Sequence, residues 1–139
     1  MMSEDNKKVE IDFEVKPYDI DAAGHVNNAV YLNWLEDLRV KLFREQIQLD
    51  SLTRNNIHLV VAHTVIKYKI PLFLFNKPRG VMEVDKYTRG IWYLSAKFKN
   101  DDSITTEAFQ KCVLIDGNNN YGMIKNIIIN GEKAENEAD

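Results

Sequence analysis

One segment of this 139-residue chain repeats its apolar side chains with a helical period, and strand-like segments flank it. In residues 29–46 the apolar residues recur at steps of three and four: Tyr31, Leu35, Leu38 and Leu42. This spacing places them on one face of an α-helix. Val30, Trp34 and Phe43 widen that face. We therefore expect a helix that is buried in a core rather than lying on a rim.

The segment before this helix alternates strictly between apolar and charged residues. Residues 9–15 read Val-Glu-Ile-Asp-Phe-Glu-Val, which is the period of a half-buried β-strand. Pro17 should end the strand, because proline cannot donate a ladder hydrogen bond. After Thr53 the composition favours strands separated by turn residues. The expected strands are residues 59–70, 81–87, 91–99 and 104–116.

Strands segregated from one helix predict an α+β fold rather than an alternating parallel α/β fold. One antiparallel sheet with the helix against its concave face satisfies the pattern. The length is that of one domain with a single hydrophobic core. We expect this domain at residues 9–130, between a tail at residues 1–8 and an acidic, disordered tail at residues 131–139.

Composition excludes several classes of protein. A hydrophobic content of 45% is too high for a disordered chain, and no apolar run approaches the roughly 20 residues that span a bilayer. The polar, acidic N-terminus is unlike a signal peptide. The single cysteine, Cys112, cannot form an internal disulfide or a thiolate metal cluster, so we expect a cytoplasmic protein without a metal. A net charge of −3 and the absence of a nucleotide fingerprint predict no nucleic-acid partner and no cofactor.

The loop before the helix, residues 18–28, is unusually rich in polar groups. Its candidates for chemistry are Asp19, Asp21, Gly24, His25, Asn27 and Asn28. Singly, such residues form turns, supply a positive φ angle or cap a helix. Together they suit acyl transfer: a carboxylate can act as general base or nucleophile, and free amides at a helix N-terminus stabilise an oxyanion. A glycine also lets a thioester carbonyl approach the backbone closely.

Residues 19–31, Asp-Ile-Asp-Ala-Ala-Gly-His-Val-Asn-Asn-Ala-Val-Tyr, resemble the signature of hotdog-fold thioesterases, with Glu36 and Arg39 following. The segment is most similar to the 4-hydroxybenzoyl-CoA thioesterase-like family. It also resembles long-chain acyl-CoA thioesterases and plant acyl-ACP thioesterases. Residues 68–71, Tyr-Lys-Ile-Pro, resemble the end of a strand in that family. The resemblance covers about residues 9–116 and implies a hotdog fold, an antiparallel sheet wrapped around one long helix.

The resemblance implies hydrolysis of an acyl thioester and assigns roles position by position. Asp21 matches the catalytic carboxylate, and Asn28 matches the helix-start position whose backbone amide polarises the thioester carbonyl. His25 and Asn27 match a polar pair that shapes the site and positions substrate or water. Ala23 stands where plant acyl-ACP members carry an asparagine, which is a departure from their catalytic set.

The same resemblance implies an acyl-CoA or acyl-ACP substrate and a role in fatty acid metabolism. Lys77 and Arg79 are candidates for contacts with the substrate's phosphates, or else they belong to a solvated strand edge. Tyr31 lines either an acyl tunnel or an ordinary core. Hotdog proteins pair into dimers and often into tetramers, so we expect a homo-oligomer with sites between subunits.

Two other functions remain as alternatives: a non-catalytic acyl-CoA-binding module, and a hotdog hydratase or dehydratase. A binding module would be expected to lack the carboxylate that Asp21 supplies, and dehydratases use a different arrangement of aspartate and histidine. We expect Asp19 to stabilise the loop by accepting backbone amides two or three residues further on. For Glu36, a pair with Arg39 at i,i+3 is favoured over a second carboxylate at the site.

Overall fold

The computed structural model describes residues 8–118, 122–124, 128–129 and 132–133. Its elements in chain order are β1 (Lys8–Asp12), a 3-10 turn (Pro17–Asp19), α1 (Asn28–Ile47), α2 (Leu49–Arg54), β2 (Ile57–Tyr68), β3 (Arg79–Thr88), β4 (Ile91–Asn100), β5 (Ser103–Asp116), β6 (Gly122–Met123), β7 (Ile128–Ile129) and β8 (Glu132–Lys133). Of the expected tails at residues 1–8 and 131–139, only Lys8, in β1, and β8, which pairs with β7, are described.

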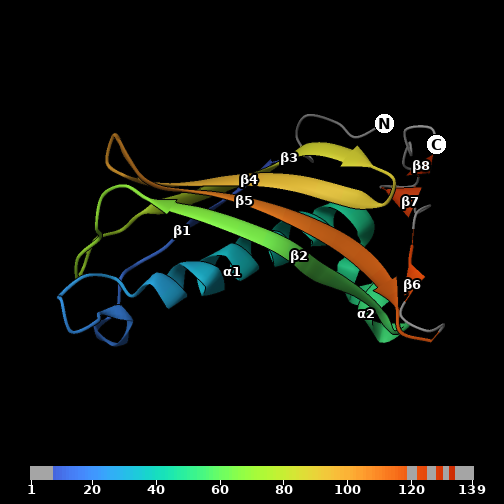
Figure 1. The fold of residues 1–139 in the computed structure, drawn as a ribbon, viewed down its shortest axis with the longest axis horizontal. Coiled ribbons are helices and arrows are strands. Elements are labelled where there is room, and N and C mark those ends of the chain that lie inside the picture. Colours follow the sequence, from blue (N-terminus) through green and yellow to red (C-terminus); the bar gives the residue numbers. More distant parts are fainter. Residues whose placement is uncertain (1–7, 119–121, 125–127, 130–131, 134–139) are drawn as a thin grey trace.

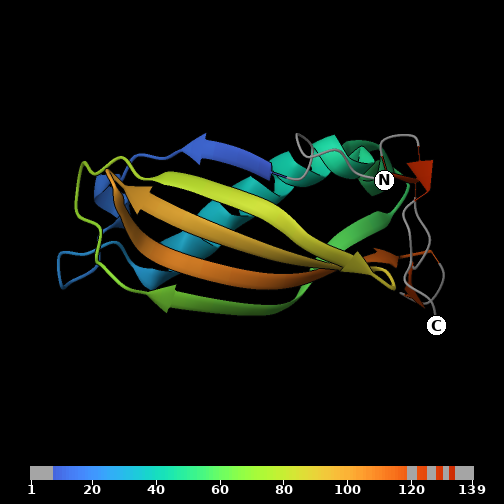
Figure 2. The same cartoon turned by 90° about the horizontal axis from the view of Figure 1, so that it is seen from above.

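The long strands form one antiparallel sheet in the order β1–β3–β4–β5–β2, with β6 paired to β5. The sheet curls over α1, which lies along its concave face (Figures 1 and 2). β3, β4 and β5 follow one another through the two-residue turns Arg89-Gly90 and Asp101-Asp102. The prediction of an α+β fold with one antiparallel sheet wrapped around one long helix is confirmed. No helix in the described ranges is long and apolar enough to cross a bilayer.

α1 begins one residue before the predicted helix and ends one residue after it. α2 was not predicted, because six residues are too few to show a helical period. Gln48 separates the two helices with a left-handed backbone, φ 53° and ψ 55°. It therefore ends α1 and turns the chain into α2.

β1 is shorter than the predicted strand at residues 9–15, and the partner segment explains why. The amides of Phe13 and Val15 still donate to the carbonyl oxygens of Pro78 and Asn76, each over 2.9 Å. Pro78 has no N–H that could donate to the carbonyl oxygen of Phe13 in exchange. The regular pairing of the two strands therefore stops, and β1 ends at Asp12. β2 is displaced by two residues from the prediction and ends at Tyr68.

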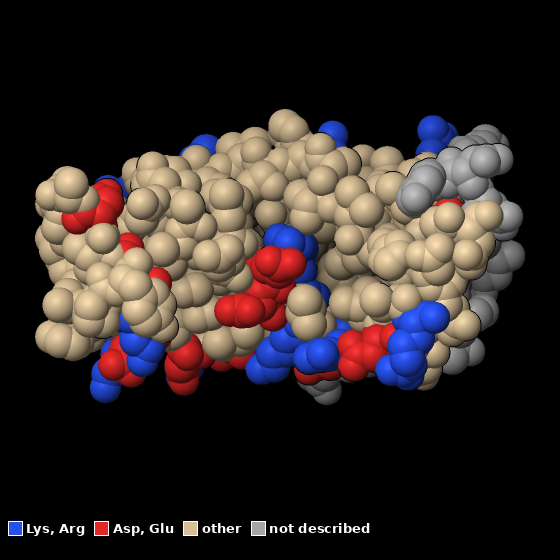
Figure 3. Space-filling model, turned by 90° about the horizontal axis from the view of Figure 1, so that it is seen from below, with Lys and Arg blue, Asp and Glu red and all other residues tan. Residues whose placement is uncertain are grey.

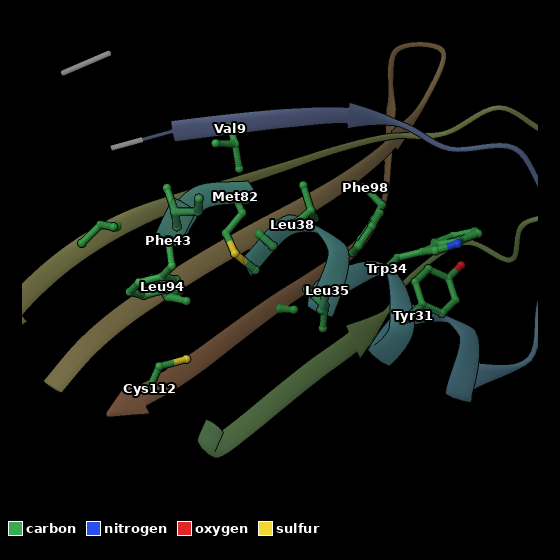
Figure 4. Packing of buried hydrophobic residues seen from close by; sticks show 14 of the residues in the cluster. Val9, Tyr31, Trp34, Leu35, Leu38, Phe43, Met82, Leu94, Phe98 and Cys112 are labelled. Atoms are coloured by element: carbon green, nitrogen blue, oxygen red, sulfur yellow. The ribbon is translucent and has the colours of Figure 1, made fainter. Parts of the chain in front are cut away.

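The core lies between α1 and the concave face of the sheet. Leu35, Leu38 and Phe43 of α1 point toward Met82, Leu94 and Phe98 of the sheet (Figure 4). Each fully buried side chain of this size contributes about 1.5–3 kcal/mol. The predicted shared face of β4 is confirmed, since its four members are all buried: Trp92, Leu94, Ala96 and Phe98. Cys112 is buried in the same core.

Candidate functional site

The loop between β1 and α1 is held in shape by its two aspartates. Oδ1 of Asp21 accepts hydrogen bonds from the backbone nitrogens of Ala23, at 2.9 Å, and His25, at 3.2 Å. The backbone nitrogen of Asp21 donates to the carbonyl oxygen of His25 over 2.8 Å. Oδ2 of the buried Asp19 accepts from the backbone nitrogen of Lys16 over 2.8 Å. Asp19 thus stabilises the loop as predicted, but through a residue three positions earlier instead of later.

The start of α1 leaves one amide free. Asn27 is the N-cap of α1. Its side-chain Oδ1 accepts a hydrogen bond from the backbone nitrogen of Ala29, and its backbone carbonyl oxygen accepts one from the backbone nitrogen of Val30, each over 2.9 Å. Asn28 is the first helical residue, and its N–H has no acceptor in the described part of the chain. Such an amide, at the positive end of the helix dipole, can donate to a developing oxyanion.

A pocket of about 250 Å³ opens between the start of α1 and the end of β2. Its lining residues are Asp21, His25, Val26, Asn28, Tyr31, Tyr68, Lys69, Ile70 and Pro71. The backbone nitrogen of Val26 donates to the carbonyl oxygen of Leu72 over 2.9 Å, which ties the polar loop to the segment after β2. The structure therefore brings two segments that are far apart in sequence to one pocket.

Two tyrosines form one side of this pocket. Tyr31 is 3% exposed and Tyr68 is 46% exposed, and their rings meet edge to face with centroids 5.4 Å apart. The hydroxyl of Tyr68 lies 3.4 Å from the carbonyl oxygen of Asn28. Burial raises the pKa of both phenols, so both remain hydrogen-bond donors at neutral pH. Tyr68 was not among the predicted site residues. Its only sequence signal was the Tyr-Lys-Ile-Pro motif.

Two predicted site residues, Gly24 and Asn27, shape the loop and are not among the residues that line the pocket. Gly24 has a φ of +85°, and a Cβ atom there would meet nothing within 4 Å. The glycine therefore supplies the left-handed turn conformation of this loop. The Asn27 side chain is engaged in the helix cap. The ring of His25, which does line the pocket, packs edge to face on Phe73 with centroids 5.1 Å apart.

Lys77 and Arg79 lie away from this pocket. Both line a groove of about 500 Å³ formed by β1, β3 and β4. That groove is at the opposite edge of the sheet from β2. Nε of Arg79 lies 2.8 Å from Oδ1 of Asp12, and its Nη1 lies 3.6 Å from Oε2 of Glu10. Within one chain, the structure does not bring these two cations to the polar loop.

Glu36 is exposed on α1 and does not line the pocket. Arg39 donates from Nη1 to Oε1 of Gln110 over 3.0 Å, and no carboxylate of the described residues lies within salt-bridge distance of it. The predicted pair of Glu36 with Arg39 is therefore not a salt bridge within the chain. The described residues also contain no group of three or more potential metal ligands.

Residues 15–135 match a family model described as the thioesterase-like superfamily. A curated relative, the long-chain acyl-CoA thioesterase FadM of Escherichia coli (strain K12), is 36% identical over 61 residues. The aligned region is 44% of this chain and 46% of FadM, so the match spans about half the length of this relative.

Solved structures share the fold. DHNA-CoA thioesterase from Staphylococcus aureus superposes with a TM-score of 0.78 at 18% identity, covering 85% of this chain and 80% of that chain. YbaW, a probable thioesterase from Escherichia coli, superposes with a TM-score of 0.74 at 24% identity, covering 83% of this chain and 87% of that chain. The curled antiparallel sheet around one long helix is thus the hotdog fold.

Proposed function

The chain belongs to the thioesterase-like superfamily, and from this premise we propose that it hydrolyses the thioester bond of an acyl-CoA. The observation that carries the proposal is that the Asp21 carboxylate and the free Asn28 amide meet in one pocket. The relative FadM is named a long-chain acyl-CoA thioesterase, which supports coenzyme A as the group that carries the acyl chain. An acyl carrier protein is the alternative carrier.

The Asn28 N–H and the α1 dipole would polarise the thioester carbonyl and stabilise the oxyanion formed on it. Oδ1 of Asp21 is held by two backbone amides, whereas Oδ2 has no hydrogen-bond partner among the described residues. Oδ2 is therefore the atom available for reaction. It either takes a proton from the attacking water, or attacks the carbonyl carbon to form a mixed anhydride that water then cleaves. In both routes the C–S bond breaks, and the sulfur leaves as a thiolate that takes up a proton.

The remaining candidates have supporting roles in this proposal. His25 positions substrate or water at the pocket, and Tyr31 contacts the acyl group. Asn27 fixes the start of α1 and so the direction of the Asn28 amide, and Gly24 allows the turn beside Asp21. Lys77 and Arg79 are proposed to contact the phosphates of coenzyme A. The proposed working unit is a homo-oligomer, a dimer or a tetramer.

The Asn28 amide can be deleted without removing the helix. Asn28 is the first helical residue, a position where proline is well tolerated, and Asn27 has the extended backbone (φ −61°, ψ 137°) that proline requires before it. We expect Asn28→Pro to lower kcat by about 100- to 1000-fold, the usual cost of one oxyanion donor. Asn28→Ala keeps the amide and is the matched control. Equal activity of the two variants would exclude the amide from the reaction.

Asp21→Asn tests the carboxylate. The asparagine Oδ1 can still accept from the amides of Ala23 and His25, so the loop is kept while the base or nucleophile is lost. Thiol release from a panel of acyl-CoAs should fall by about 100-fold or more. Near-normal turnover would refute the role of Asp21. Binding of acyl-CoA without thiol release by the wild type would favour a binding module, and hydration of an enoyl-CoA would favour a hydratase.

A further inference from the structure

We propose that the ring of Tyr31 closes the inner end of the pocket and limits the acyl group of the substrate to about eight carbons. This deepens the proposed function, on which it rests, by naming the size of the acyl group. Three features support it: the position of Tyr31 along the pocket, the aromatic side chains packed behind it, and the volume of the pocket.

One wall of the pocket is the first turn of α1. Asn28 and Tyr31 both line the pocket, and they are three residues apart, or about 4.5 Å along the helix axis. The opposite wall comes from the end of β2 and the residues after it, which supply Tyr68 and Ile70. An acyl group whose carbonyl oxygen lies at the Asn28 amide therefore meets Tyr31 as its next contact along α1.

A row of cross-strand neighbours on the sheet supports the Tyr31 ring from below. The members of this row are Tyr68 of β2, Thr106 of β5, Phe98 of β4 and Gly80 of β3. Thr106 is a small buried residue between two aromatic ones. The Tyr31 ring meets the rings of Tyr68 and Phe98 edge to face, with centroids 5.4 Å and 5.5 Å away. Burial raises the pKa of the Tyr31 phenol and the Thr106 side chain lowers it in part, so Thr106 is also a neighbour of this ring.

The core behind Tyr31 is filled by further aromatic rings. Trp34, one turn along α1, meets Tyr31 edge to face at 5.3 Å and stacks on Phe13 at 5.1 Å. Figure 4 shows Tyr31 and Trp34 beside Phe98. These rings press closely on the sheet, since a Cβ atom at Gly80 would lie 2.7 Å from Phe13 and 3.0 Å from Phe98. An acyl chain that passed Tyr31 would have to displace packed rings, which costs free energy as overpacking does.

The volume of the pocket sets the size of the acyl group. An apolar protein cavity of about 150 Å³ holds one benzene molecule, so a pocket of about 250 Å³ holds roughly ten non-hydrogen atoms. The oxygen and the sulfur of the thioester account for two of them, which leaves room for about eight carbons. FadM is named a long-chain acyl-CoA thioesterase. We therefore expect this chain to prefer shorter acyl groups than those for which FadM is named.

A longer chain would have to leave the pocket and lie on the outside of the molecule. The underside, along which α1 lies, is largely uncharged, with charged side chains along one margin and in a small group near the middle (Figures 1 and 3). Apolar carbons on such a surface stay partly in water. Full burial of one methylene increases affinity about fourfold, and partial burial increases it less. Affinity should therefore rise with each carbon up to about eight and then level off.

A series of saturated acyl-CoAs from acetyl to palmitoyl measures the limit. Thiol release gives kcat/KM for each chain length. Isothermal titration calorimetry with S-alkyl-CoA thioethers, which cannot be hydrolysed, gives dissociation constants that do not depend on activity. Both quantities should improve about fourfold per methylene up to octanoyl and by less than about twofold per methylene beyond it. A steady improvement up to palmitoyl in the wild type would overturn the proposal.

Substitutions at Tyr31 test whether its ring sets the limit. Tyr31→Ala removes a group the size of benzene, so the limit should move by about six carbons, to roughly fourteen. Tyr31→Leu keeps more of the packing and should move the limit less, in the same direction. Tyr31→Phe keeps the ring and should leave the limit at about eight carbons. Phenol added to the Tyr31→Ala variant should refill the cavity and return the limit toward the wild-type value.

A second ring on α1 provides the matched control. Phe43 is fully buried, packs edge to face on Trp92 with centroids 5.3 Å apart, and does not line the pocket. Phe43→Ala should therefore lower the melting temperature, as Tyr31→Ala does, but leave the limit unchanged. Equal shifts of the limit in the two alanine variants would assign it to loosened packing and overturn the proposal. A wild type that binds the thioethers with this limit but releases no thiol would refute the proposed activity and support the role of Tyr31.

Discussion

Oδ1 of Asn27 lies 2.9 Å from the backbone nitrogen of Ala29, and this hydrogen bond fixes the residue at which α1 begins. Because the cap uses the amide of Ala29, the neighbouring amide of Asn28 is the one left free at the pocket. The functional role proposed for Asn28 therefore depends on the side chain of the residue before it. Helix capping and the proposed oxyanion site are two results of the same local geometry.

Removing the cap should destabilise the protein. We expect Asn27→Ala to lower the free energy of unfolding by about 1 kcal/mol, because the Ala29 amide loses its acceptor. Asn27→Asp retains an acceptor oxygen and should restore most of the loss. Urea denaturation monitored by circular dichroism measures both variants. Equal losses in the two variants would show that the cap contributes nothing.

Gly80 should not tolerate a side chain. A Cβ atom at this position would lie 2.7 Å from Cε2 of Phe13, 3.0 Å from Cε1 of Phe98 and 3.1 Å from Cδ1 of Leu38. We expect Gly80→Ala to cost about 1–3 kcal/mol through overpacking. Phe13→Leu in the same chain should recover part of that cost. Additive effects in the double-mutant cycle would contradict a direct clash.

Cys112 should be unreactive in the folded protein. Burial raises the pKa of its thiol to about 11, so only about one molecule in a thousand carries the reactive thiolate at pH 8. A chromogenic disulfide reagent should label it only after denaturant is added. Because the folded-state pKa is raised from 9.0, the thiol's contribution to stability is complete below pH 9 and declines as the pH rises toward 11. Rapid labelling of the native protein would contradict this burial.

Lys77 and Arg79 should differ as phosphate contacts. Arg79 is already engaged by Asp12 and Glu10, whereas Lys77 has no ion pair among the residues that the structure describes. Under the proposed function, Lys77→Ala should raise KM severalfold with little change in kcat, and Arg79→Ala should have a smaller effect. Acyl-CoA titrations measure both constants. An unchanged KM in both variants would show that the groove lined by Lys77 and Arg79 does not bind the substrate.

Much of the fold could be predicted because local patterns and tertiary packing agree. The period of α1 matches the core face that it buries, and the alternation of β4 matches its inward side chains. The end of β1 depends instead on Pro78, about 65 residues away in sequence, and periodicity within residues 9–15 carries no trace of it. α2 could not be predicted because its six residues make fewer than two helical turns, too few to show a helical period of apolar side chains.

The sequence indicated the part of the pocket that comes from one continuous segment and missed the part that comes from a distant one. The polar loop carries its candidate groups in nearby residues, so the resemblance of residues 19–31 to a family signature could assign roles to Asp21 and Asn28, roles that stay predictions. Tyr68 and Lys69 reach the same pocket from the end of β2, which only the folded chain reveals. The pairing of Glu36 with Arg39 was expected from their spacing, but Gln110 of β5 takes the guanidinium.

The connectivity of the sheet also bears on how the chain folds. β3, β4 and β5 are joined by two-residue turns, whereas β1 pairs with β3 and β2 pairs with β5 only after long loops are closed. Low contact order favours early formation of the three-strand meander. During synthesis, however, β1, the polar loop and α1 leave the ribosome before any of those strands. The segment that carries the proposed catalytic groups is therefore made early but acquires its geometry late.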